Sequence, residues 1–222
     1  PSEPTVRHFL SNPKRVKREI VVDELLSSDA YGRYAAVVWG NLLVGRGSGA
    51  EVLVQKRFRD WLYEQFKAES GFDEITRALL TATGTPLETP AVTWSLHHDT
   101  KPENLIGAAA RIFLGTQIQC AQCHDHPFEA WTQEDFYGMA AFFARTKQQR
   151  LLLAVGVSET ASGEIRLGGM PDGKEIKPKF LDGTAVPRRH VKRRRQLLAD
   201  WIVDPSNNQF ARAIVNRVWG RM

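Results

Sequence analysis

Residues Cys120–Phe128 read CAQCHDHPF, and we expect the rest of the chain to be organised around this stretch. Cys120 and Cys123 are the only cysteines among the 222 residues, and His124 directly follows the second one. Two cysteines separated by two residues and followed by a histidine form the attachment signature of a c-type haem. In such proteins each thiol adds to one haem vinyl group, and the adjacent imidazole becomes the proximal iron ligand.

The spacing of these three residues has a physical reason. Side chains at positions i, i+3 and i+4 fall on one face of a helical turn. Both sulfurs can then reach opposite edges of one macrocycle while the imidazole points at the iron. The sequence therefore predicts haem c as the cofactor, with Cys120 and Cys123 as its anchors and His124 as its proximal ligand.

A zinc site is the main alternative, because cysteine and histidine are also the usual zinc ligands. The stretch holds four such side chains within seven residues, Cys120, Cys123, His124 and His126. Ligands so close in sequence cannot easily surround one tetrahedral ion, so a zinc site would recruit a more distant ligand. The candidates upstream of the stretch are His97, His98 and Asp99.

Two further readings of the cysteines stay open. A redox dithiol of the thioredoxin type is expected to follow a strand and open a helix, and that context is missing before Cys120. The two thiols could also form a structural disulfide or stay unmodified. On the motif alone, we favour haem over zinc and over both of these readings.

Apolar residues recur at helical spacing over most of the chain, which predicts a mainly α protein. Leu151–Val157 and Glu164–Leu167 are short and β-like, and they predict a small hairpin. Residues 1–19 are polar, contain three prolines and are expected to be extended. Helices are predicted at about residues 20–26, 31–45, 51–67, 72–84, 100–115, 132–143, 196–203 and 210–222.

Two of these helices flank the motif. The first is expected to bury Leu105 and Phe113 and to end at Gly115. The second begins with a capping box of Thr132 and Asp135. Its apolar face consists of Phe136, Met139, Ala140 and Phe143. We expect the Met139 side chain to pack in the core. The two helices should form an αα-hairpin with the cysteines at its bend.

A turn-rich loop at Gly168–Gly173 contains Met170, which is followed by a proline. Many small cytochromes present their sixth iron ligand as a methionine in an irregular loop after the attachment site. Met170 is therefore the first candidate for the sixth ligand. The alternative is an exposed loop methionine with no such role.

The net charge of +5 comes from one basic run near the C-terminus. The run consists of Arg188, Arg189, Lys192, Arg193, Arg194 and Arg195. Taking these six charges from +5 leaves −1 for the rest of the chain. We favour a solvated linker leading into a helix over a binding site for nucleic acid or another polyanion. No run of about 18 apolar residues is present, so no membrane span is expected, and no signal peptide is visible.

These motifs resemble a cytochrome-like domain of unknown function that is abundant in planctomycetes. The resemblance rests on short segments along the chain: Val22–Leu26, Tyr31-Gly32, Phe58–Trp61, Phe113–Gly115, Cys120–Phe128, Trp131, Asp135–Tyr137, Ala141–Phe143 and Lys179–Gly183. Arg194–Trp201 and Phe210–Trp219 resemble the opening of the partner domain that usually follows it. We therefore expect an extended segment at 1–19, a helical cytochrome-like domain at 20–186, and a linker with the truncated start of a C-terminal partner domain at 187–222.

The resemblance implies an exported protein, periplasmic or at the cell surface, and it assigns no reaction. It carries over Cys120, Cys123 and His124 as the presumed haem attachment set. His126 also matches a family position and could hydrogen-bond a propionate or serve a second metal. The leading hypothesis is a c-type haem protein that transfers electrons to or from an unidentified redox partner. The alternative is a zinc-binding structural or docking module of an exported multidomain protein.

Overall fold

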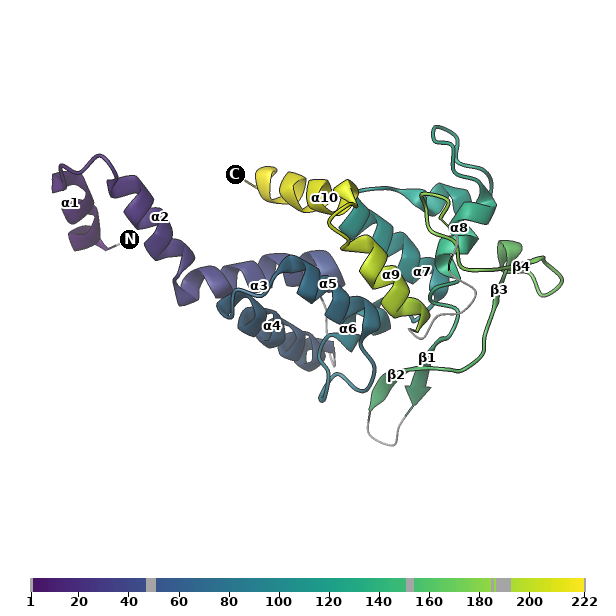
Figure 1. Cartoon of the computed structure of the whole chain (residues 1–222). Helices are drawn as coiled ribbons and strands as arrows, with labels where there is room; N and C mark the ends of the chain where they lie inside the picture. The colour runs from purple at the N-terminus through teal and green to yellow at the C-terminus, as the bar shows by residue number, and fades with distance from the viewer. Residues whose placement is uncertain (1, 47–50, 151–153, 185, 187–192, 222) are drawn as a thin grey trace.

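A computed structural model describes residues 2–46, 51–150, 154–184, 186 and 193–221 of the chain. The α-helices are α1 (Glu3–Ser11), α2 (Lys17–Leu26), α3 (Asp29–Val44), α4 (Glu51–Lys67), α5 (Phe72–Thr81), α6 (Val92–His97), α7 (Pro102–Ala109), α8 (Gln133–Ala140), α9 (Arg194–Ile202) and α10 (Asn208–Trp219). The other elements are a π-helix η1 (Ala110–Leu114), 3-10 helices η2 (Ile118–Gln122) and η3 (Leu167–Gly169), and strands β1 (Thr146–Arg150), β2 (Val155–Glu159), β3 (Ile165–Arg166) and β4 (Glu175–Ile176). The predicted mainly α class with a small β insertion is confirmed (Figure 1). No helix in these ranges is long and apolar enough to cross a membrane.

The prediction of an extended segment at residues 1–19 is wrong, because α1 and the start of α2 are helical. The Ser2 hydroxyl caps the backbone of the first turn, and Pro4 occupies a position where its missing N–H costs nothing. A 2.7 Å ion pair between Glu3 and Arg7 joins successive turns. The N-terminal polar residues and proline therefore start a helix. α1 and α2 contain no buried residue and project from the body (Figure 1).

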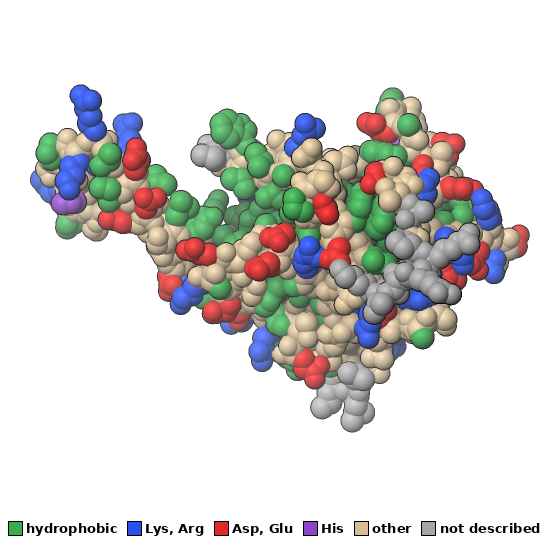
Figure 2. All heavy atoms as spheres, in the orientation of Figure 1, with side chains coloured by type: hydrophobic (Ala, Val, Ile, Leu, Met, Phe, Trp, Pro, Cys, Tyr) green, Lys and Arg blue, Asp and Glu red, His purple; other side chains and the backbone are tan. Residues whose placement is uncertain are grey.

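An apolar surface remains uncovered between the projecting helices and α10. Leu25 and Leu26 of α2, Tyr34 of α3, and Val218 and Trp219 of α10 are all about half exposed or more. Figure 2 shows apolar side chains gathered in the hollow between these elements. This surface lies outside the core that positions the motif.

The core joins the helices before and after the motif. Phe58 and Leu62 of α4 are fully buried, as the amphipathic pattern predicts. The buried ring of Trp94 in α6 lies 6.2 Å from that of Phe113 in η1 and 6.3 Å from that of Phe143, which follows α8. Because Phe113 precedes the motif and Phe143 comes after it, Trp94 ties both sides of the motif to one core.

The predicted β-hairpin exists, but its strands are different from the predicted ones. β1 pairs with β2 in an antiparallel register that sets Thr146 opposite Glu159. The second predicted strand falls partly in β3, which pairs with β4 in a separate two-stranded sheet. Sequence patterning missed β1 because its residues, TKQQR, are polar and mostly exposed. Val157 of β2 bonds to Gly84 through two backbone hydrogen bonds of 2.8 Å, which ties the hairpin to the loop after α5.

The boundary predicted near residue 187 does not divide the core. α9 packs against α5 and buries Leu198 and Ile202 in the same cluster as the helices around the motif. α10 packs against η1, where the Arg217 side chain donates to the backbone carbonyl of Ile112. In Figure 1, α9 lies across the body, and α10 extends from it toward the C-terminus. In the described residues, the C-terminal helices therefore belong structurally to the helical domain, and residues 187–192 of the linker fall outside the described ranges.

The last two residues of the basic run, Arg194 and Arg195, are buried rather than solvated. Arg194 is buried and donates two hydrogen bonds, of 2.8 and 2.7 Å, to the carboxylate of Glu164. Arg195 is 1% exposed, donates to the carbonyls of Leu80 and Ala82, and lies 3.5 Å from the carboxylate of Glu159. The linker prediction and the polyanion hypothesis therefore both fail for these two arginines, which instead fix the start of α9 to the hairpin and to α5.

We predict that Arg194→Ala lowers the free energy of unfolding by about 3 kcal/mol, because it leaves Glu164 partly buried without its main partner. Arg193 is the matched control, since its side chain is 64% exposed. Arg193→Ala should cost about 0.5 kcal/mol or less. Urea denaturation of both variants provides the measurement. Equal, small losses would contradict a structural role for Arg194.

Candidate functional site

The motif begins on the short 3-10 turn η2, which contains Cys120, ends before Cys123 and packs against α7 and α8. Ile118 and Ala121 of this turn are fully buried. In a 3-10 helix the side chains at i and i+3 eclipse one another. Ile118 and Ala121 are three residues apart and face the core. Cys120 and Cys123 have the same spacing but a different starting position, so they lie on another side of the turn. Both thiols are exposed and free, so they are accessible to a ligand outside the core.

Close contacts with α7 and α8 hold the turn in place. A Cβ atom at Gly107 of α7 would lie 2.6 Å from the side-chain amide of Gln119, so glycine is required for this approach. On the other side, the Gln133 side chain of α8 donates a 3.0 Å hydrogen bond to the carbonyl of Gln122. The turn is thus supported from both flanking helices, as the αα-hairpin prediction requires.

His124 is exposed and has one ring nitrogen engaged. Its Nδ1 lies 2.7 Å from the backbone carbonyl oxygen of Asp125. A carbonyl oxygen only accepts hydrogen bonds, so Nδ1 must carry the proton and donate. The neutral ring then has its lone pair on Nε2. Metal-binding histidines commonly show this arrangement, in which the second nitrogen donates to a carbonyl and orients the ring.

His126 has the opposite arrangement. Its Nδ1 accepts hydrogen bonds from the backbone N–H groups of Phe128, at 3.2 Å, and Glu129, at 3.0 Å. The lone pair is therefore on Nδ1, and Nε2 carries the proton in the neutral ring. The ring also packs edge-on against Trp131 at 5.6 Å, and its backbone N–H donates to the Trp131 carbonyl. His126 closes the loop after the motif and leaves only an N–H donor for an outside ligand.

The residues proposed for the zinc alternative do not form a metal site in the described structure. His124 and His126 present different groups, a lone pair and an N–H. In the described part of the chain, no three His, Cys, Asp or Glu side chains gather closely enough to hold an ion. The ligands that a zinc site would recruit are elsewhere, since His97 lies beside Gly45 at the end of α3.

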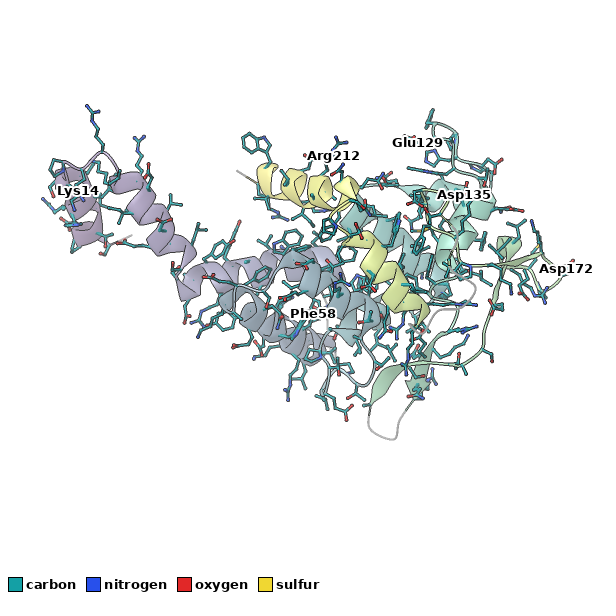
Figure 3. All side chains as sticks on the ribbon, viewed as in Figure 1. Lys14, Phe58, Glu129, Asp135, Asp172 and Arg212 are labelled. Atoms are coloured by element: carbon teal, nitrogen blue, oxygen red, sulfur yellow. The ribbon has the colours of Figure 1, made fainter. Side chains whose placement is uncertain are left out.

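Met170 lies on a different loop from the motif and is 56% exposed. Gly168 and Gly169 take positive φ values there, as expected of the predicted turn. In Figure 3, Asp172 in this loop and Glu129 in the motif loop stand far apart on separate projections. An ion pair between Lys174 and Glu134 connects the Met170 loop to the start of α8. The role of Met170 as sixth ligand therefore stays a prediction without support from the geometry.

His98, one of the upstream residues that a zinc site could recruit, is largely buried. Its ring packs edge-on against Trp94 at 5.2 Å, and Nε2 has no hydrogen-bond partner among the described residues. Burial, followed by the charges of His97 and Arg111, lowers the pKa of His98 to about 4, against weaker opposing effects of Asp99 and the Leu43 backbone. His98 is therefore a neutral core residue at physiological pH.

Several residues that support the motif were not singled out by sequence reasoning. Gln133 donates from its backbone N–H to the carboxylate of Asp125 at 2.9 Å, which fixes the loop to α8. Burial raises the pKa of Tyr137, and the nearby Glu103 and Cys123 raise it further, so a protonated phenol lies near the second thiol. Only the capping box of Thr132 and Asp135 was visible in the sequence, and it is confirmed. The other contacts depend on how the loop folds back.

Comparison with family models identifies a family of unknown function. A family model described as "PSCyt2: Protein of unknown function (DUF1549)" matches residues 1–148, which is more than half of the chain. No curated protein and no solved structure matches the chain.

We predict that stability falls as the pH drops from about 6.5 to about 4, because the folded state holds His98 neutral while the unfolded state takes up a proton. The pKa difference corresponds to a loss of about 3 kcal/mol at most. His98→Gln should remove this part of the pH dependence, and His8→Gln, in the exposed α1 helix, should leave it unchanged. Denaturant unfolding across this pH range provides the measurement. Parallel curves for the native chain and His98→Gln would contradict the assignment.

Proposed function

The chain belongs to the PSCyt2 family of proteins of unknown function (DUF1549), and we propose that it is an exported c-type haem protein that transfers single electrons. Cys120 and Cys123 are the covalent anchors, and His124 is the proximal iron ligand. A bound haem would supply one-electron redox chemistry that none of these side chains provides by itself. The exported location, in the periplasm or at the cell surface, follows from the family resemblance in the sequence.

The observation that carries the proposal is the state of His124. The 2.7 Å hydrogen bond from Nδ1 to the Asp125 carbonyl leaves the Nε2 lone pair available beside two free, exposed thiols. The neighbouring His126 has its lone pair engaged by backbone N–H groups. Of the two histidines in the stretch, the one with the unengaged lone pair is therefore the one that the haem signature requires.

The attachment chemistry balances without any leaving group. Each thiol S–H adds across one vinyl double bond, so that sulfur bonds to one carbon and the hydrogen goes to the other. The mass of the protein therefore rises by that of one whole haem. Exposure of Cys120 and Cys123 allows both additions without opening the core, because the buried residues of the turn are Ile118 and Ala121.

The surroundings of the motif suit electron transfer at the surface. Phe128 is 90% exposed in the loop that follows His124, and it offers an apolar face close to the attachment residues. The supporting turn is held by α7 and α8, so the site lies at the surface on a rigid base. A surface position permits close approach of a redox partner. We assign no enzymatic reaction and no identity to that partner.

We predict that the chain exported in a host with a cytochrome c maturation system gains the mass of one haem. Cys120→Ala combined with Cys123→Ala should give the bare polypeptide mass. His124→Ala should change the ferric absorption spectrum of attached haem by removing the proximal nitrogen. His126→Ala is the matched control, and it should keep the iron spectrum because the Nδ1 lone pair of His126 is engaged by backbone N–H groups and Nε2 offers only an N–H.

Intact mass spectrometry and absorption spectroscopy of the four proteins provide the measurement. A bare polypeptide mass for the native chain, with stoichiometric zinc, would replace the haem proposal by the zinc alternative. Equal spectral changes in His124→Ala and His126→Ala would contradict the distinct roles assigned to the two imidazoles.

A further inference from the structure

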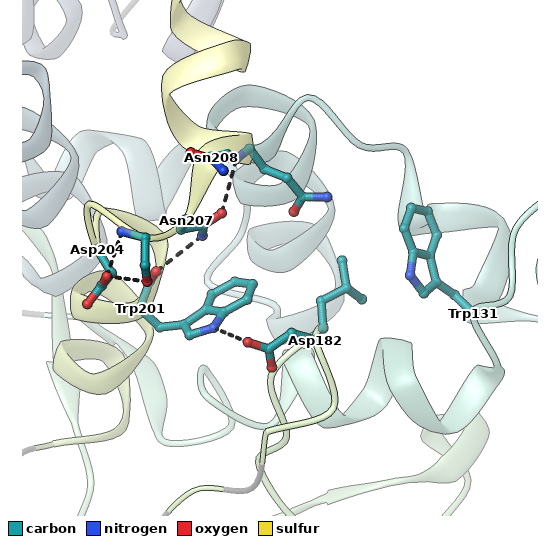
Figure 4. A pocket seen from close by; sticks show the side chains of 9 residues that line it. Trp131, Asp182, Trp201, Asp204, Asn207 and Asn208 are labelled. Carbon is teal, nitrogen blue, oxygen red and sulfur yellow. Dashed lines mark hydrogen bonds between the residues drawn. The ribbon is translucent and has the colours of Figure 1, made fainter.

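A cavity of about 420 Å³ lies between the loop after the motif and the turn that joins α9 to α10. Trp131 comes from the loop, Leu181 and Asp182 from the segment before the linker, and Trp201 from α9. Figure 4 shows Trp131 across the cavity from Trp201 and Asp204. The volume falls in the range of small-molecule sites. The haem proposal gives this cavity no role.

Trp201 is held rigidly at the wall of the cavity. Its indole N–H donates a 2.9 Å hydrogen bond to the carboxylate of Asp182. Its ring stacks on Phe180 at 5.2 Å, and Phe180 stacks on the buried Phe142 at 4.8 Å. Since the indole is fixed from behind and at its N–H edge, the surface that it presents to the cavity needs no rearrangement before binding.

Trp131 forms a second fixed aromatic wall. Its ring packs against His126, and its carbonyl accepts a 2.8 Å hydrogen bond from the His126 backbone. Trp131 is half-buried and lines the cavity. The two indoles thus reach the cavity from separate elements.

Polar groups line the remaining wall. Asp204 accepts hydrogen bonds from the backbone and hydroxyl of Ser206 through one oxygen, and these bonds lower its pKa. The exposed side-chain amides of Asn208 and Gln209, at the start of α10, make no hydrogen bonds within the described residues. A carboxylate oxygen and two amides can therefore accept from and donate to a ligand with several hydroxyl groups.

We propose that this cavity binds a neutral saccharide, with a pyranose ring against the tryptophans. A pyranose has apolar C–H faces and a rim of hydroxyl groups, so it matches aromatic walls combined with amide and carboxylate groups. The lining contains no lysine or arginine and has two aspartates, so it disfavours phosphate and other anions. A small cation could also meet tryptophan and carboxylate. However, a small cation such as a quaternary ammonium would make no hydrogen bonds with the side-chain amides of Asn208 and Gln209.

Titration of the full chain with four hexasaccharides tests the proposal. The probes are the β-1,4-linked hexamers of glucose, xylose, mannose and galactose, and the signals are tryptophan fluorescence and calorimetric heat. At least one probe should bind with a millimolar or lower dissociation constant. Trp131→Ala and the double variant Asn208→Ala/Gln209→Ala should each weaken that binding by about tenfold or more.

The matched control is Trp219→Ala, because Trp219 is 75% exposed on α10 and does not line the cavity. This variant should bind like the native chain. The proposal is overturned if none of the four hexasaccharides binds at millimolar concentration. It is also overturned if the cavity variants bind as well as the control, or if tetramethylammonium displaces the sugar and binds more tightly.

Discussion

Burial of Ile118 and Ala121 is the constraint on which the site depends. These two residues anchor the 3-10 turn η2 against α7 and α8, and they leave Cys120 in the turn and Cys123 at its C-terminal end exposed on another side. An α-helical turn would set residues at i and i+3 apart by about 60° around the axis, because it has 3.6 residues per turn. The short turn therefore leaves both thiols at the surface, while the core beneath them stays closed.

The rest of the fold keeps that turn rigid. Trp94 packs near Phe113 and Phe143, on the two sides of the motif, and the C-terminal helices cover the same core. In the sequence, Arg194 and Arg195 belong to a basic run, but in the structure both are buried at the start of α9. Arg194 and Arg195 use their donors on Glu164 and on backbone carbonyls, so their charges serve folding rather than binding to a polyanion.

Most helices and the position of the motif could be predicted from the sequence, because α4, α7 and α8 carry apolar periodicity and α8 has a local capping box; α1 and α6 were missed. Three other features could not be predicted. The strand β1 is polar throughout, so alternation gives no signal. The partners of Arg194 and Arg195 lie some 30 to 115 residues away in sequence. The opposite tautomers of His124 and His126 depend on backbone groups that only the folded loop brings to each ring.

The central claim is that two thioether bonds join a haem to Cys120 in η2 and to Cys123 directly after it. The reduced pyridine haemochrome spectrum of the exported native chain tests it most directly, because the visible band position reports how many vinyl groups have been saturated. The account predicts the band of a haem with both vinyl groups saturated, at one haem per chain. A spectrum with both vinyl groups intact, or no haem in correctly exported protein, would contradict it.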